Sequence, residues 1–78
     1  MNWYTYDDLK YLPNNTEHIE VLRTNKTGSS YLMHNQKYEN INNVPTWHDF
    51  ELGNCNCETS DRWITEEALI KAVRQSMK

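Results

Sequence analysis

The chain has 78 residues, of which 24% are charged and 12% aromatic, and its formal net charge is −3. This length supports one hydrophobic core and not two, so we expect a single domain over residues 1–78. The eight basic residues are dispersed, and a net-negative chain without a positive stripe is not expected to bind nucleic acid. No segment reads as a signal peptide or a membrane span, which favours a cytoplasmic protein with reduced cysteines.

Aliphatic side chains are sparse, whereas three Trp and five Tyr supply large apolar surfaces. We therefore expect a thin core in which aromatic rings do much of the packing, and a homodimer remains one option. Only two glycines are present, so asparagine is expected to serve many of the turns.

A short helix is predicted at residues 5–12. Thr5 can cap it, Asp7 and Asp8 lie in its first turn, and Pro13 ends it. Two helical turns are unstable alone in water, so this helix should dock on the rest of the domain.

A β-hairpin is predicted over residues 17–38. Ile19 and Val21 alternate in its first strand, Asn25 and Gly28 bound a turn, and residues 31–33 form the centre of the second strand. The asparagine-rich residues 39–43 are predicted to be a loop.

Residues 44–52 show the clearest two-residue alternation, which predicts a third strand. We expect its more apolar face to be buried, and Pro45 favours an edge position. Residues 53–61 are polar and are predicted to be a loop. The buried face would carry Val44, Thr46, His48, Phe50 and Leu52.

A C-terminal helix is predicted over residues 65–77. Thr65 can cap it, acidic residues fill its first turn and basic residues follow, as the helix dipole favours. Leu69 and Val73 lie on its apolar stripe. The order indicates an α+β domain of the form α-β-β-β-α, in which a three-stranded antiparallel sheet is covered by the packed C-terminal helix. One core should contain Val44, Phe50, Leu52, Leu69 and Val73.

Trp47 lies on the opposite face of the third strand, between Asp49 and Glu51. An exposed Trp flanked by acids is typical of a protein contact site, because Trp is enriched in binding hot spots. The alternative is that Trp47 packs beneath the N-terminal helix. A second aromatic cluster, either a lid on the sheet or part of the contact surface, consists of Tyr4, Tyr6 and Tyr11.

Cys55 and Cys57 are the residues most suggestive of a metal site, with His48 as a third ligand. Paired Cys-x-x-Cys knuckles, which are typical of zinc sites, are missing, so we expect two inert cysteines, no metal and no cofactor. His18, His34 and His48 are expected to be hydrogen-bonded strand residues.

No catalytic motif is recognisable, so we do not expect an enzyme. The sequence favours a small protein-binding module, an inhibitor or adaptor of a cytoplasmic macromolecule. A zinc-stabilised structural domain is the alternative. In size, charge and composition the chain resembles accessory proteins of bacteriophages, such as anti-CRISPR proteins, a likeness of general character that involves no particular residue. The binding residues would be Trp47, Asp49, Glu51, Tyr4, Tyr6 and Tyr11.

Overall fold

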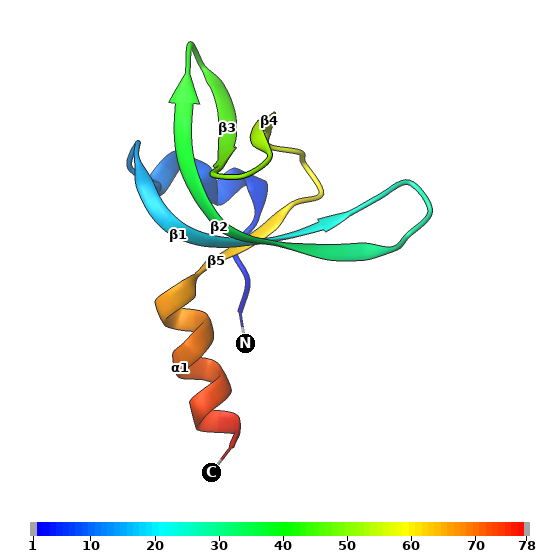
Figure 1. Cartoon of the computed structure of the whole chain (residues 1–78), viewed down its shortest axis with the longest axis vertical. Coiled ribbons are helices and arrows are strands. Elements are labelled where there is room, and N and C mark those ends of the chain that lie inside the picture. The colour runs from blue at the N-terminus through cyan, green and yellow to red at the C-terminus, as the bar shows by residue number, and fades with distance from the viewer. Residues whose placement is uncertain (1, 78) are drawn as a thin grey trace.

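The computed structural model describes residues 2–77 as a small α+β domain (Figure 1). Five strands form one antiparallel sheet in the order β4-β3-β2-β1-β5. The first four strands follow one another as a meander, and the last strand returns to the free edge of the first. The elements are the 3₁₀ helix η1 (Tyr6–Tyr11), β1 (Thr16–Thr24), β2 (Ser30–Ile41), β3 (Val44–Asp49), β4 (Gly53–Asn56), β5 (Arg62–Thr65) and α1 (Glu66–Ser76).

The prediction of a three-stranded sheet is wrong, because two further strands lie where the sequence predicts a loop or the approach to the last helix. β4 is a short edge strand paired with β3, and its polar residues show no hydrophobic alternation. β5 pairs with β1 and buries Trp63 and Ile64. Four residues are too few for a two-residue periodicity to stand out.

The predicted N-terminal α-helix is also wrong in type, since η1 is a single 3₁₀ segment. Its start follows the expected local chemistry: the Asp8 carboxylate accepts hydrogen bonds from the backbone N–H of Thr5 at 2.8 Å and from the Thr5 hydroxyl at 3.1 Å. Leu9 is buried in the core. This docking is what so short a helix requires.

The hairpin predicted over residues 17–38 is confirmed as β1 and β2. Its turn is closed by the side chain of Asn25, which accepts hydrogen bonds from the N–H groups of Thr27 and Ser29, each at 3.0 Å. β2 is longer than expected and runs on to Ile41, so most of the predicted loop at 39–43 is strand. Asn42 and Asn43, with φ of 51° and 66°, make the two-residue turn into β3.

The sheet bends sharply where β1 and β2 are irregular. His18 and Asn35 have φ of 59° and 56°, the β1–β2 register shifts beside them, and His18 Nδ1 lies 2.9 Å from Asn35 Oδ1. Such bulges increase local twist and bend a strand. Figure 1 shows the resulting curvature of both strands. Within residues 2–77, asparagine supplies four of the five non-glycine residues with positive φ, which confirms its predicted role in tight backbone conformations.

The core lies inside this curved sheet and is largely aromatic. Tyr38 and Trp47 meet edge to face at 5.7 Å between ring centroids, a favourable arrangement for aromatic rings. The buried cluster is completed by aliphatic residues of η1 and β1 and by a Trp of β5; its members are Leu9, Ile19, Val21, Tyr38, Trp47 and Trp63.

The predicted inward face of residues 44–52 is wrong at three of its five positions, whereas Thr46 is buried and His48 is half-buried. Val44, Phe50 and Leu52 are 43%, 65% and 88% exposed, whereas Trp47 is fully buried. β3 ends at Asp49, and the residues from Phe50 to Leu52 form a turn. The apolar–polar alternation of the sequence continues through this turn, where it does not indicate which side chains are buried.

Helix α1 forms at the predicted position, with Thr65 Oγ1 accepting a hydrogen bond from the N–H of Ala68 at 3.1 Å. Its predicted role as the cover of the sheet is wrong. The helix projects from one end of the molecule and meets mainly β1 and β5 (Figure 1). Leu69 is half-buried and Val73 is 46% exposed.

This arrangement predicts opposite responses at two aliphatic positions. Ile19→Ala should lower the free energy of unfolding by about 2–5 kcal/mol, because it empties space in the core. Val73→Ala should change it by less than about 0.5 kcal/mol, as is usual for exposed positions. Denaturant unfolding at low micromolar concentration measures both. A larger loss for Val73→Ala than for Ile19→Ala would place the core under α1 instead.

Candidate protein-binding surface

The structure places Trp47 in the core and not on the surface. Its side chain is fully buried, and the indole Nε1–H donates a hydrogen bond to Asp61 Oδ2 at 3.0 Å. A buried indole with a satisfied N–H is a packing residue. Trp47 is therefore unavailable as a contact anchor, and the contact surface must be sought elsewhere.

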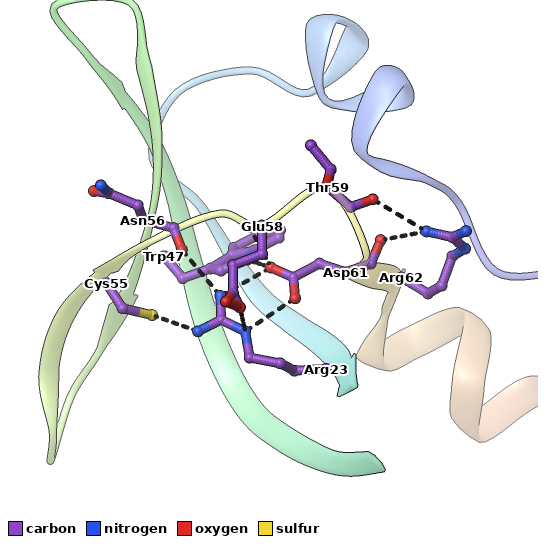
Figure 2. A network of polar contacts seen from close by, with 8 residues as sticks. All are labelled: Arg23, Trp47, Cys55, Asn56, Glu58, Thr59, Asp61 and Arg62. Carbon is purple, nitrogen blue, oxygen red and sulfur yellow. Dashed lines mark hydrogen bonds and ion pairs between the residues drawn. The ribbon is translucent and has the colours of Figure 1, made fainter. Parts of the chain in front are cut away.

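The carboxylate bonded to Trp47 is the centre of a polar network that also holds Arg23 of β1 (Figure 2). Arg23 Nε and Nη2 donate to the two Asp61 oxygens at 3.0 and 2.9 Å, a bidentate pair. Asp61 Oδ2 also accepts the N–H of Glu58 at 2.8 Å. The same guanidinium reaches the Asn56 carbonyl at 2.9 Å and Glu58 Oε2 at 3.1 Å.

This network fixes the charge states of its members. Burial acts to raise the pKa of Asp61, but the hydrogen bonds from Arg23, from the Glu58 N–H and from Trp47 outweigh it and hold that pKa below its usual range. The hydrogen bond to Asp61 is the main cause that raises the pKa of Arg23. Both groups therefore stay ionised at neutral pH, and the pair clamps residues 56–61 onto β1.

A second carboxylate organises the turn between β3 and β4. Asp49 Oδ1 accepts the N–H groups of Glu51 and Leu52 at 2.8 and 2.9 Å, and Asp49 Oδ2 accepts the side-chain amide of buried Gln36 at 2.7 Å. The Gln36 hydrogen bond, then those from the two backbone N–H groups, lower the pKa of Asp49. Gly53, with φ of +86°, completes the turn. Asp49 is thus a structural residue that holds Phe50 and Leu52 outward.

These outward side chains border a groove between the turn and the first half of β2. The groove has a volume of about 540 Å³. Phe50 and Leu52 are 65% and 88% exposed, and Tyr31 and Leu32 of β2 are about half exposed at 48% and 50%. We call this the β2–β4 groove, and its main apolar residues are Tyr31, Leu32, Phe50 and Leu52.

The β2–β4 groove carries two acidic side chains and, within the part of the chain that the structure describes, one acceptor without a donor. Glu51 is exposed, Asp49 is ionised, and the buried Gln36 Oε1 receives no hydrogen bond from any residue within 2–77. Arg23 also lines the groove, but its charge is matched by Asp61 and Glu58. The groove therefore has exposed apolar side chains from the turn and from β2, and an exposed acidic residue, Glu51, on the turn.

The three predicted tyrosines do not form a single surface of equal exposure. Tyr4 stacks on Trp63 at 4.7 Å between ring centroids and is 50% exposed. Tyr6 is half-buried against the core, and Tyr11 is 75% exposed, with Lys10 Nζ 5.1 Å from its ring centroid. None of the three lines the β2–β4 groove. Tyr4 and Tyr6 instead pack against β5 and the core, whereas Tyr11 is exposed.

The zinc alternative requires His48 beside the two cysteines, and the strand register separates them. Cys55 pairs with Trp47 and faces the core, whereas His48 pairs with Asn54 on the opposite face and lies 2.7 Å from Glu39 Oε2. Cys57 also packs against the core, and burial is the main cause that raises its pKa well above the usual range. Within residues 2–77, no three His, Cys, Asp or Glu side chains gather closely enough to hold a metal ion.

Comparisons of the chain with protein families, with curated proteins and with solved structures each find no match. Among residues 2–77, no helix is both long and apolar enough to cross a membrane. Function is therefore inferred from the chemistry of the site itself.

The sequence predicted the acidic residues of this surface but placed Phe50 and Leu52 in the core, and it predicted Tyr31 and Leu32 only as residues of a strand. Phe50 and Leu52 continue the apolar–polar alternation of β3, so the pattern predicted a strand where the structure has a turn. Gly53 directly after Leu52 is the signal that could have revealed the turn, because glycine readily adopts the positive φ found there. Tyr31 and Leu32 carry no such signal.

The Asp61 network predicts a large effect of a nearly isosteric substitution. Asp61→Asn should destabilise the protein by about 3–5 kcal/mol, because it leaves the Arg23 charge without its buried partner. Glu58→Gln is the matched control and should cost less than about 1 kcal/mol, since the Glu58 side chain is half-exposed. Chemical denaturation of the two variants tests this. Equal effects of both substitutions would contradict a central role for Asp61.

The lowered pKa of Asp61 also predicts acid sensitivity. The native pKa lies below the unfolded value of about 3.9, so the unfolded state binds the proton more tightly. The ionised Asp61 carboxylate therefore stabilises the folded protein fully above about pH 4, and this stabilisation is lost as the pH falls through the pKa that Asp61 has in the folded state. In NMR titrations the Trp47 indole N–H resonance should shift only below about pH 4. A shift centred above that pH would refute the expected ionisation.

Proposed function

We propose that this protein is a small protein-binding module, acting as an inhibitor or adaptor, and that it binds through the β2–β4 groove. The observation that carries the proposal is the display of Phe50 and Leu52 on a turn held by Asp49. Exposed apolar side chains cost solubility and add nothing to the core. When they gather with others around a groove, they are typical of a protein contact site.

The chemistry of the groove indicates the kind of segment it accepts. The apolar side chains of the groove fit an apolar residue of the partner, while the exposed Glu51 fits a Lys or Arg beside it. The net charge of −3 of the whole chain also favours a basic partner during diffusional encounter. We therefore propose a peptide segment that carries an apolar residue next to a basic one.

Binding is favoured over catalysis by the state of the two thiols. Cys55 lines the groove but packs against the core. Cys57 lies outside the groove lining, and burial raises its pKa, so its thiol stays protonated at neutral pH and is a poor nucleophile. The groove is open and lies between a turn and a strand. The two free thiols fit the cytoplasmic location proposed for this module.

A peptide display library selected against the folded protein tests the proposal. Enriched peptides should combine an apolar residue with an adjacent Lys or Arg. The double substitution Phe50→Ser with Leu52→Ser should weaken their binding at least about tenfold, because hot-spot residues contribute more than 1 kcal/mol each. The melting temperature should change little, since both side chains are exposed.

Val44→Ser is the control, because Val44 is also an exposed apolar residue but lies at the β2–β3 turn, outside the groove. It should leave peptide binding unchanged. Glu51→Lys should slow association, and high salt should reduce that effect. A selection without enriched peptides, or peptides that bind the double variant as tightly as the original protein, would reject the proposed surface.

A further inference from the structure

Helix α1 lacks the support that a helix of its length needs. It has 11 residues, and none of Glu66–Ser76, all of which the structure describes, is buried. Helices shorter than about 12–15 residues are marginal in water unless an apolar face is packed. Here Leu69 and Ala72 are only half-buried, and Ile70 and Val73 are 42% and 46% exposed, so much of the apolar surface of the helix is open. This open surface is therefore suited to a partner.

A hollow of about 1020 Å³ lies along α1, beside the start of β1. Its lining changes charge along the helix. Glu66 and Glu67 mark the end near the sheet, together with Glu17 of β1, whereas Lys71 and Arg74 lie farther along, and Ile70 stands between the two groups. One side of the helix therefore has an acidic end, an apolar middle and a basic end.

We propose that this side of α1 binds a second copy of the chain, with the two helices antiparallel about a two-fold axis near Ile70. A two-fold contact requires a surface that is complementary to itself when its direction is reversed. Reversal places the acidic end of one helix against the basic end of the other. Parallel helices would instead oppose like charges at both ends.

The spacing of the charges fits this symmetry. Glu67 and Arg74 are seven residues apart, which is about two turns or 10.5 Å along the helix, and they lie on nearly the same side. In an antiparallel pair centred between residues 70 and 71, each Glu67 lies level with the partner copy's Arg74. The contact between Glu67 of one copy and Arg74 of the other therefore forms twice, once on each side of the two-fold axis. Ile70 packs between these two contacts.

A second copy fits the surface better than an unrelated protein, because one chain supplies both halves of the charge pattern. The contact is short, and interfaces below about 1,200 Å² are typical of weak association. We therefore expect monomers at low micromolar concentration and dimers at roughly 100 µM and above. The inference does not depend on the β2–β4 groove, whose residues lie outside this hollow.

Analytical ultracentrifugation with two charge reversals tests the arrangement. The original protein should associate as its concentration rises from about 5 to about 500 µM. Glu67→Arg and Arg74→Glu should each weaken self-association at least about tenfold, because each opposes like charges across both symmetric contacts. An equimolar mixture of the two variants should dimerise at least as tightly as the original protein, since all four charges are then matched.

The mixture separates a contact between copies from damage within one helix, because each chain keeps its own altered helix in the mixture. Asp7→Lys and Lys26→Glu are the control pair, with the same charge changes at exposed positions far from α1 in the sequence. They should neither weaken self-association alone nor strengthen it when mixed.

The inference would be overturned if the original protein stayed monomeric over the whole range. A mixture of Glu67→Arg and Arg74→Glu that bound no better than either variant alone, or no better than the mixed control pair, would overturn it as well. Failure of this inference can be distinguished from failure of the proposed function by measuring peptide binding at the β2–β4 groove. Both α1 variants should keep their affinity for the peptides selected against that groove.

Discussion

The buried carboxylate of Asp61 is the constraint on which the rest of the structure depends. It joins three segments that are far apart in the sequence, through Arg23 of β1, Trp47 of β3 and the backbone of Glu58. A charge with no solvent exposure is tolerated only when its hydrogen-bonding capacity is filled, and here four donor contacts fill it. The largest core side chain is thereby tied to the loop that leads into β5.

Two aspartates make this small sheet rigid where its sequence is most polar. Asp61 clamps the segment between β4 and β5, and Asp49 clamps the turn between β3 and β4. Between them lies β4, which has little apolar surface of its own to hold it in place. The turn that borders the groove keeps its shape because its backbone hydrogen bonds end on the Asp49 carboxylate. Apolar residues can then point to solvent without collapsing inward.

Local signals in the sequence predicted what depends on neighbouring residues alone. The first hairpin and the capped C-terminal helix belong to this class, because their turn and cap residues lie beside the elements they form. Local signals left open whether Trp47 is exposed or buried, since its place in the core depends on Asp61, which is 14 residues later. The prediction of the contact residues was wrong for the same reason. Phe50 and Leu52 appear to be core residues until Asp49 is seen to end the strand.

The contact between the first residues and the last strand has a consequence for how the chain is made. Trp63 donates its indole N–H to the Thr5 carbonyl at 2.9 Å, and Tyr4 stacks on the same ring. Synthesis proceeds from the N-terminus, so β1 to β4 emerge before β5 exists. During that interval β1 has an unpaired edge, and Tyr4 lacks the ring on which it stacks. An open edge of this kind invites pairing with other chains. The nascent protein is thus open to such pairing until β5 emerges and covers this edge.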